Sequence, residues 1–415
     1  MITFGIEEEF QFLDPATLRP ADVAAHVFRA LSETREWRDV AHQEFLASQV
    51  EHASAVFTSL DEARIALIGF RRFIADRAAE LGVIAASVGT PPDTQPFPTI
   101  TDVERYHRIV TALGGLIADH QLTGLHVHIG IPDRDNGVIA LNAARPWMPL
   151  LTALAGNSPL WRGYDTGYAS WRTVLLRRWT ISGGPPSFVD AADYDRRTTR
   201  LVGIGGAADV AHISWNVRLS AHLPTIEFRM ADTQLDAEST LLIVALCRAL
   251  VTHVLERPEA ADVAARASAD VPPELLSSAV LHSAHHGMTR DVFDPVVGGL
   301  APAGETLTRF VGMVERELAE AGDLDAVTDA AARLLRDGFG AERQRAAFAS
   351  DGMAGVRRLI DATIVAERDG RGDRAGLGDL GARGDLGPRG DLGTRGDLGA
   401  RADQDRNGEP MTSNR

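Results

Sequence analysis

Three consecutive glutamates lie inside an apolar run close to the start of the sequence. Glu7, Glu8 and Glu9 fall within the segment Ile2–Phe12, where apolar residues otherwise recur at every second position. This period of two predicts a β-strand that carries Glu7 and Glu9 on one face and Glu8 on the other. Acidic residues are poor strand formers and are costly to bury without a partner, so the pattern requires an explanation.

Two explanations fit an acidic strand of this kind. An edge strand with a solvated face needs no partner for its carboxylates, because most charged residues are exposed. Alternatively, two carboxylates held side by side bind a cation, and hard ions such as Mg²⁺ and Mn²⁺ prefer oxygen ligands. The glutamate run by itself favours the solvated edge strand. The other segments of the chain determine whether a cation site is the better explanation.

Three further segments alternate like strands and place a polar pair on one face. The segments are residues 44–52, 124–132 and 225–232, and the pairs are Gln49 and Glu51, His126 and His128, and Glu227 and Arg229. One such strand is explained by an exposed edge. Four of them favour a sheet with one face lined by metal ligands and arginine, and with helices on the other face.

Helices are expected from capping patterns and from apolar periodicity. The expected helical ranges are 59–82, 101–120, 138–155 and 236–257, and nearly all of the remainder to residue 367 is also expected to be helical. Shorter strands are expected at 83–89 and 212–218. An ordered loop rich in glycine, aromatic and arginine residues is expected from Asn157 to Arg172.

All 42 basic residues are arginines, because the sequence contains no lysine. This absence excludes a phosphate-binding loop of the Gly-Lys-Ser/Thr type and a Schiff-base lysine. A protein of this composition that handles phosphate must use arginine and metal ions. The planar guanidinium suits that task, since it grips two phosphate or carboxylate oxygens at once.

The composition also bounds the class of protein. The 415 residues are 45% hydrophobic, which is enough to bury a sizeable core, and the net charge of -15 argues against nucleic-acid or anionic membrane partners. No basic segment precedes an apolar run at the N-terminus, and no apolar stretch reaches spanning length, so we expect a cytoplasmic protein. The single Cys247 excludes a disulfide within the chain, in keeping with a reducing compartment.

The character of the sequence changes near its end. Residues 378–401 are four copies of Gly-Asp-Leu-Gly-x-Arg without an aromatic residue. Such a repeat cannot bury a core, so we expect residues 367–415 to be a disordered tail and residues 1–366 to form the functional domain.

Five motifs occur in an order that resembles a known family. They are Gly-Ile-Glu-Glu-Glu-Phe, Gln-Val-Glu, His-Val-His-Ile-Gly-Ile-Pro-Asp, Asn-Ser-Pro-Leu-Trp-Arg-Gly-Tyr-Asp-Thr-Gly-Tyr-Ala-Ser and Ile-Glu-Phe-Arg-Met-Ala-Asp. The same order is found in the carboxylate–amine ligases of the glutamate–cysteine ligase type 2 family, and the resemblance covers residues 1–366. Several motifs in a fixed order are far more specific than any one of them.

The resemblance implies an α+β fold of the glutamine-synthetase type, with an antiparallel sheet as the active-site floor and helices packed on its outer face. It implies ATP-dependent amide formation between a carboxylate, such as that of glutamate, and an amine, such as that of cysteine. ATP and Mg²⁺ or Mn²⁺ are the implied cofactors, and an acyl phosphate is the expected intermediate. The implied metal ligands are Glu7, Glu9, Glu51, His128 and Glu227, and Arg229 is the implied phosphate contact.

Further candidates come from the loops. Arg162 and Arg172 are candidate contacts for phosphate or a substrate carboxylate, although a salt bridge explains an arginine as often. Gly205 and Gly206 belong to a flexible run that could cover the nucleotide phosphates, without the spacing of a known phosphate-binding motif. The expected partners are small molecules, and a homodimer is the common default for such a protein.

One segment departs from the family pattern. Near position 285 a Trp-Arg-Ala-Ala-Arg-type helix is expected, but the chain has His282-Ser283-Ala284-His285-His286-Gly287, so an arginine that could contact substrate is absent. The family's Asp-Arg-Gln-Arg is nearly kept as Glu342-Arg343-Gln344-Arg345.

Two other classes of function remain open from the sequence. A metal-dependent hydrolase would add further histidines to the His126/His128 pair, and the candidates are His253, His282, His285 and His286. Its usual (β/α)8 barrel needs strands that alternate with helices, and the sequence after residue 236 lacks them. A nucleotide-binding protein without catalysis is the other alternative, since a fold does not fix a function.

Overall fold

A seven-stranded antiparallel sheet forms the centre of the protein. The computed structural model describes residues 2–179 and 181–368, so nearly all of the expected tail lies outside the described residues. The strand order is β10-β11-β5-β1-β3-β2, and β4 also pairs with β1. The strands are β1 (Phe4–Leu13), β2 (Ala41–Gln43), β3 (Gln49–Ala53), β4 (Ile84–Ala86), β5 (Gly124–Gly130), β10 (Val217–Leu219) and β11 (Thr225–Asp232). The prediction of an antiparallel sheet in an α+β protein is confirmed.

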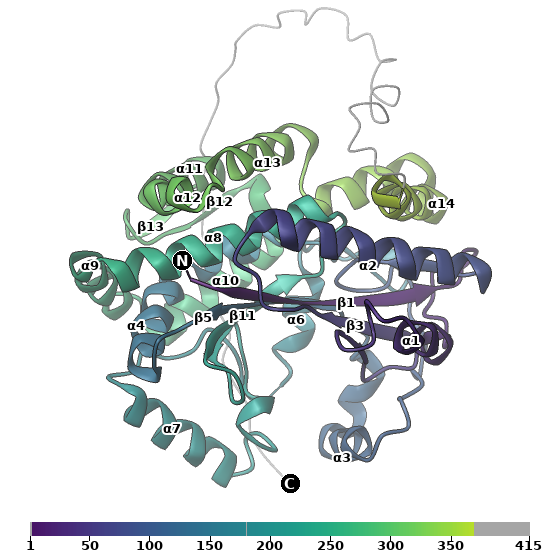
Figure 1. Cartoon of the computed structure of the whole chain (residues 1–415), viewed down its shortest axis with the longest axis horizontal. Helices are drawn as coiled ribbons and strands as arrows, with labels where there is room; N and C mark the ends of the chain where they lie inside the picture. Colours follow the sequence, from purple (N-terminus) through teal and green to yellow (C-terminus); the bar gives the residue numbers. More distant parts are fainter. Residues whose placement is uncertain (1, 180, 369–415) are drawn as a thin grey trace, which may run out of the picture. The chain divides into compact units, whose positions relative to one another are not determined.

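Helices pack on one face of this sheet, above it in Figure 1. α2 (Leu60–Glu80) and α8 (Ala237–Glu256) lie nearest, and their apolar side chains share one core with Ile6, Val127 and Phe228 of the sheet. By length and composition α8 could cross a membrane, but 78% of its apolar window is buried inside the protein. Such burial is typical of the core helix of a globular domain.

Other helices extend this layer or flank the opposite face. The remaining long elements are α1 (Ala24–Glu33), α4 (Arg134–Ala144), α5 (Met148–Leu154), α9 (Pro258–Ala269), α10 (Pro273–His286), α11 (Ala303–Met313), α12 (Glu315–Ala321), α13 (Leu324–Asp337) and α14 (Gly340–Arg368). The helices α3 (Glu104–Leu113), α6 (Trp171–Leu176) and α7 (Ala191–Gly203) lie below the sheet in Figure 1. The face of the sheet that α2 and α8 do not cover therefore lies between α3 and α7.

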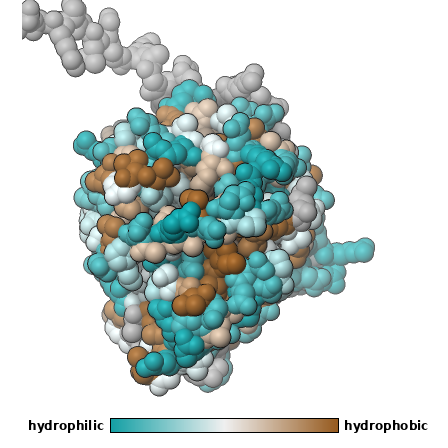
Figure 2. All heavy atoms as spheres, turned by 90° about the vertical axis from the view of Figure 1, so that its left-hand side faces the viewer, coloured by the Kyte–Doolittle hydropathy of each residue, from teal (hydrophilic) through white to brown (hydrophobic). Residues whose placement is uncertain are grey.

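The face of the molecule shown in Figure 2 is mainly hydrophilic. On the face shown in Figure 2, hydrophobic side chains form small separate groups among hydrophilic ones. The hairpin of β12 (Asp291–Asp294) and β13 (Gly299–Pro302) exposes Val296, Val297 and Leu300. Scattered exposed apolar residues are normal for a globular protein.

Several element boundaries differ from those expected. Residues 44–52 do not form one strand, because β2 and β3 are separated by Glu44–Ser48, where Phe45 and Leu46 are both buried and break the alternation. The helix expected from residue 101 begins at Glu104, and the side chain of its N-cap residue Val103 forms no capping bond.

One helical expectation was wrong for an identifiable reason. The helix expected over 138–155 is divided into α4, a short 3-10 turn and α5, because Pro146 and Pro149 lack the amide hydrogen that a continuous helix needs. The C-terminal part is nearly all helical, as expected, apart from the hairpin of β12 and β13. The strand expected over 212–218 is two short strands, β9 (Ser214–Trp215) and β10.

Glu8 points to the helical side of the sheet, as the alternation predicts. Its carboxylate accepts hydrogen bonds from Arg71 of α2, at 3.1 Å from Nε and 2.5 Å from Nη2, and both side chains are 0% exposed. Arg71 also donates to the carbonyl oxygens of Gln234 and Leu235, just before α8. The pair therefore joins β1, α2 and the start of α8.

We expect Arg71→Met to lower the free energy of unfolding by about 3–5 kcal/mol, because it leaves the Glu8 carboxylate buried without its cation. Adding Glu8→Leu should recover part of that loss. Arg64→Met on the same helix is the matched control, since its pair with Glu238 is partly exposed and should contribute about 0–1 kcal/mol. Urea denaturation followed by circular dichroism measures all three, and equal losses for Arg71→Met and Arg64→Met would contradict the assignment.

Candidate active site

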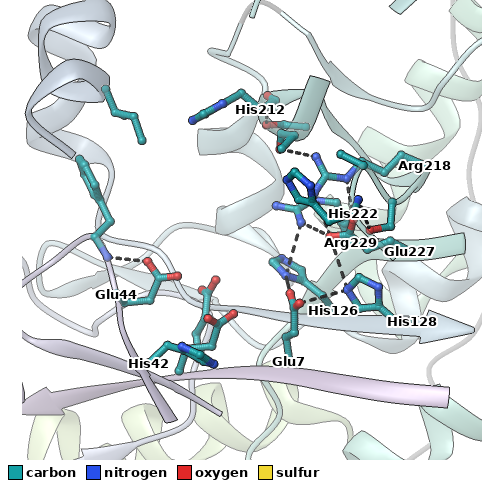
Figure 3. A pocket seen from close by; sticks show the side chains of 18 of the residues that line it. Glu7, His42, Glu44, His126, His128, His212, Arg218, His222, Glu227 and Arg229 are labelled. Carbon is teal, nitrogen blue, oxygen red and sulfur yellow. Dashed lines mark hydrogen bonds and ion pairs between the residues drawn. The ribbon is translucent and has the colours of Figure 1, made fainter. Parts of the chain in front are cut away.

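The sheet face opposite α2 and α8 forms the floor of a cavity of about 530 Å³. Strands β1, β3, β5 and β11 supply the floor, and α3 and the segment from Ala211 to Leu223 supply parts of the walls. The cavity is lined by a group of ionisable side chains, Glu7, Glu9, His42, Glu44, Glu51, Tyr106, His120, His126, His128, His212, Arg218, His222, Glu227 and Arg229. Figure 3 shows many of them converging from separate strands.

The strand register brings these side chains together. Glu9 lies opposite Glu51, and Glu7 lies opposite His126. His128 lies opposite Glu227 on the next strand. Residues directly opposite in an antiparallel pair point to the same face with Cβ atoms about 5 Å apart. Four segments that are distant in the sequence thus form one continuous polar surface.

Glu7, His128 and Glu227 form a first candidate metal site, because one ligand atom of each lies within 4.8 Å of the others. Nδ1 of His128 lies 2.9 Å from the Thr225 hydroxyl, a contact that leaves Nε2 as the free ligand nitrogen when Nδ1 carries the proton. Nε2 is buried without a hydrogen bond, 3.2 Å from Oε1 of Glu7 and 3.9 Å from Oε1 of Glu227. This orphaned nitrogen between two carboxylates fits a divalent cation.

Glu9, Glu44 and Glu51 form a second candidate metal site, again with ligand atoms within 4.8 Å of one another. Burial and the neighbouring Glu44 carboxylate raise the pKa of Glu9 to about 8. Burial and the same neighbour also raise the pKa of Glu51 well above its usual range. Three carboxylates this close need a cation to be ionised together, so this site also fits a hard divalent ion.

Glu7 and Glu227 are ionised although both lie in the cavity floor. Burial opposes ionisation of Glu7, but the hydrogen-bonded contact with His126 and the close contact with His128 lower its pKa below the usual range. For Glu227, burial is outweighed by the charges of Arg229 and Arg218, which also lower the pKa. The first site therefore offers two negative charges at neutral pH.

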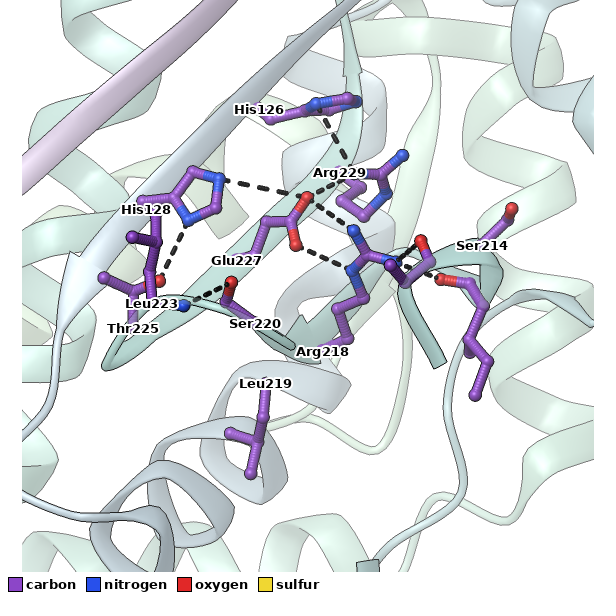
Figure 4. A network of polar contacts seen from close by, with 12 residues as sticks. His126, His128, Ser214, Arg218, Leu219, Ser220, Leu223, Thr225, Glu227 and Arg229 are labelled. Atoms are coloured by element: carbon purple, nitrogen blue, oxygen red, sulfur yellow. Dashed lines mark hydrogen bonds and ion pairs between the residues drawn. The ribbon is translucent and has the colours of Figure 1, made fainter. Parts of the chain in front are cut away.

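Two arginines hold Glu227 in place (Figure 4). Arg218 donates to both carboxylate oxygens, at 2.6 Å from Nε and 3.1 Å from Nη2. Arg229 donates to Oε1 of the same carboxylate, and its Nη1 also lies 3.4 Å from Nδ1 of His126. The positively charged side chains of Arg218 and Arg229 thus lie directly beside the carboxylates of the cavity floor.

The structure places the other predicted site residues outside the main cavity. Arg172 is buried behind Arg229, where both line a smaller pocket, and its guanidinium lies so close to Gly124 that a Cβ there would come within 2.4 Å of it. Arg162 pairs with Asp119 at 2.7 Å on the surface, with 57% of its side chain exposed. Gly205 and Gly206 lie in the turn after α7 and do not line the cavity.

Sequence reasoning missed Glu44 and Arg218 and left His126 out of the ligand set, although His126 joins Glu7 and Glu51 in a third ligand group. Glu44 was hidden because residues 44–52 were interpreted as one strand. Arg218 could have been found from its position in a hairpin, since β10 places it opposite Glu227. The histidines nominated for a hydrolase, His253, His282, His285 and His286, do not line the cavity.

Fold and site together define an α+β protein whose central sheet carries carboxylates, imidazoles and guanidinium groups on one face. That donor set suits divalent cations and phosphate oxygens. The chain belongs to glutamate–cysteine ligase family 2, whose family model matches residues 3–362. The resemblance found in the sequence is thereby confirmed.

Individual relatives agree with this membership. A protein of Saccharopolyspora erythraea named "Putative glutamate–cysteine ligase 2-1" is 39% identical over 349 residues, which cover 84% of this chain and 90% of the relative. The glutamate–cysteine ligase of Francisella tularensis, solved in complex with AMP, has a similar fold, with a TM-score of 0.60, 12% identity, and coverage of 88% of this chain and 89% of that one.

A second solved structure shows the same fold within a longer protein. A bifunctional glutathione synthetase from Pasteurella multocida matches with a TM-score of 0.60 and 14% identity, over 88% of this chain and 52% of that protein. The chain therefore spans about half the length of that protein.

We expect binding of Mn²⁺ at pH 7 to release protons. Glu9 is mostly protonated there, because its pKa of about 8 lies above the pH, and it must ionise to bind a metal. Titration calorimetry in two buffers of different protonation enthalpy measures the release, which should fall between pH 7 and pH 9. Glu9→Gln should reduce it and the exposed Glu62→Gln should not. Identical heats in both buffers at pH 7 would reject this view of the second site.

Proposed function

We propose that the protein is an ATP-dependent carboxylate–amine ligase that forms an amide through an acyl phosphate. The observation that carries this proposal is the pair of adjacent ligand clusters, Glu7/His128/Glu227 and Glu9/Glu44/Glu51, on one sheet face beside Arg229. Membership of glutamate–cysteine ligase family 2 supports it. The cavity is then the active site, and the sheet is its floor, as in the glutamine-synthetase type of fold.

The residues fit Mg²⁺ or Mn²⁺. Glu7, His128 and Glu227 would hold one ion, and Glu9, Glu44 and Glu51 would hold another. Bound there, the ions would supply positive charge to the phosphate oxygens of ATP and reduce the repulsion between ATP and an attacking carboxylate.

The protein's own groups position the reactants. In this proposal Arg229 binds the transferred phosphoryl group or the acyl phosphate, because its guanidinium faces the cavity beside both ligand clusters. Arg218 holds Glu227 from the other side and keeps that carboxylate ionised. Arg172 supports the backbone of Arg229, since its Nη atoms lie 3.4 and 3.5 Å from the Arg229 carbonyl oxygen. Arg162 has no role at this site.

The chemistry proceeds in two steps. The substrate carboxylate attacks the γ-phosphate of ATP, which converts a poor electrophile into an acyl phosphate and releases ADP. The amine then attacks the acyl carbon and phosphate leaves. Holding both reactants in one cavity supplies much of the rate, because it replaces an encounter in solution by a positioned contact.

Glutamate and cysteine are the proposed substrates, with γ-glutamylcysteine as the product. The names of the relatives support this choice. The floor of the cavity is anionic, whereas arginines and histidines line one side, so an amino-acid carboxylate would bind toward Arg229.

The function is tested by measuring ADP release from ATP in the presence of Mg²⁺. Each of the twenty amino acids is supplied as the carboxylate substrate and is paired in turn with each of the twenty as the amine substrate. We expect ADP only when a correct pair is present, with glutamate plus cysteine among the productive pairs. Release of ADP without an acid, or nucleotide binding without turnover for every pair, would contradict ligation. Hydrolysis that depends on zinc but not on ATP would favour a hydrolase instead.

Removing one ligand from either cluster should abolish turnover while the fold persists. We expect Glu227→Gln and Glu7→Gln to reduce ADP release by about 100-fold or more, since even outer-shell partners of metal ligands change activity by about 10–100-fold. Glu44→Gln should raise the Mg²⁺ concentration needed for half-maximal rate. The exposed Glu62→Gln serves as the control, and normal turnover in both Glu7→Gln and Glu227→Gln would reject the site.

A further inference from the structure

The ligase step proposed above has a requirement that the two metal clusters do not meet. An amino-acid amine is largely an ammonium ion at pH 7, because its pKa is about 8 or higher, and an ammonium nitrogen has no lone pair with which to attack. A base in the cavity must remove a proton from it. The base must face the reactants and must be free of the metal ligands.

His212 meets both conditions. It lines the cavity, only 14% of its side chain is exposed, and both of its ring nitrogens are buried without a hydrogen-bond partner among the described residues. Figure 3 shows its ring at the upper wall of the cavity, on the side opposite Glu7 and Glu44. An imidazole nitrogen in such a position can accept a proton from a bound amine.

The carboxylate of Asp209 lies beside this ring as an ion-pair neighbour. Its Oδ1 lies 2.8 Å from Nδ1 of His212, and it also accepts the backbone N–H of His212 at 3.1 Å, which caps the short turn Val210–His212. A carboxylate beside Nδ1 favours the tautomer with its proton on Nδ1, so that Nε2 keeps its lone pair. Asp209 and His212 therefore form a close carboxylate–histidine pair at the wall of the cavity.

Arg218 ties this dyad to the metal-binding floor. Its guanidinium donates to the carbonyl oxygens of Ala211 and Ile213, the two neighbours of His212 in the chain, and to the carboxylate of Glu227. One side chain therefore sets the position of the His212 segment relative to the floor. A base used in the second chemical step needs such a fixed position relative to the acyl phosphate.

The other histidines of the cavity suit this role less well. His126 and His128 contact the carboxylate of Glu7. His120 packs against Phe45 and Trp179, and burial together with Arg172 lowers its pKa to about 4. Within residues 2–179 and 181–368, no ion pair joins His42 or His222 to a carboxylate.

We propose that Nε2 of His212 is the general base of the ligation step and that Asp209 is its positioning residue; this inference rests on the proposed ligase function. The ammonium loses one proton to Nε2, which becomes an imidazolium, and the nitrogen lone pair forms the C–N bond. The C–O bond to phosphate then breaks, and phosphate leaves with that electron pair. The second nitrogen proton leaves with the phosphate, and His212 returns the first proton to solvent.

Hydroxylamine separates this role from a structural one, because it is already neutral at pH 7 and attacks acyl phosphates without a base. The experiment compares L-glutamate plus L-cysteine with L-glutamate plus hydroxylamine, in the full-length protein with ATP and Mg²⁺. If that pair gives no product, the most productive acid and amine of the twenty-amino-acid matrix replace it. Phosphate release and hydroxamate formation are the two readouts.

We expect His212→Gln to slow amide formation with the amino-acid amine by about 10²–10⁴-fold, the usual contribution of a general base, and to leave hydroxamate formation at the wild-type rate. Asp209→Asn keeps the cap of the turn. It should also slow amide formation with the amino-acid amine, by a smaller factor, and leave hydroxamate formation at the wild-type rate. His26→Gln, on the exposed surface of α1, is the control and should change neither rate.

The outcomes separate this inference from the proposed function. Equal loss of both reactions in His212→Gln and Asp209→Asn, or no loss in either, contradicts the base assignment but leaves the ligase function standing. A wild-type protein that forms hydroxamate but accepts no amino-acid amine also contradicts it. Absence of any product in the wild-type protein, hydroxamate included, contradicts the proposed function and this inference together.

Discussion

Repulsion among carboxylates on one face of a sheet is the constraint on which the rest of this structure depends. Glu7, Glu9 and Glu51 come together because β1 lies between β3 and β5, and Glu44 reaches the same place from the loop after β2. Without cations, burial together with this crowding keeps protons on Glu9 and Glu51, as their raised pKa values show. The face is thus built to bind positive charge, and this property, more than any single residue, favours the proposed chemistry.

The two faces of β1 show how differently one residue type is stabilised. Glu8 is neutralised by Arg71 within the protein, so its charge serves the fold and is closed to ligands. Glu7 and Glu9 face the cavity, and in the part of the chain that the structure describes no ion pair joins either of them to an arginine, so they can bind metal ions. Alternation along a single strand therefore separates a structural glutamate from two functional ones.

Prediction from the sequence succeeded where local periodicity was strong. The strand predicted at 225–232 is β11 with the same bounds, and the apolar helix predicted at 236–257 is α8. It failed where two buried residues in succession broke the pattern, as at Phe45 and Leu46, and this error concealed Glu44. Arg162 was predicted to contact phosphate or a substrate carboxylate because it lies in the loop Asn157–Arg172. Its side chain instead pairs with Asp119 on the surface, a contact that no local sequence pattern encodes.

The sequence by itself determined which faces of the strands are polar, the absence of lysine chemistry and the family, because each is written in residue types and their spacing. Only the tertiary structure decided that β5 and β11 lie beside β1, that Arg218 stands opposite Glu227, and that His212 faces the same cavity. Strand order and register depend on contacts between segments far apart in the chain. The free energy of those contacts arises only when the whole sheet and its helices pack together.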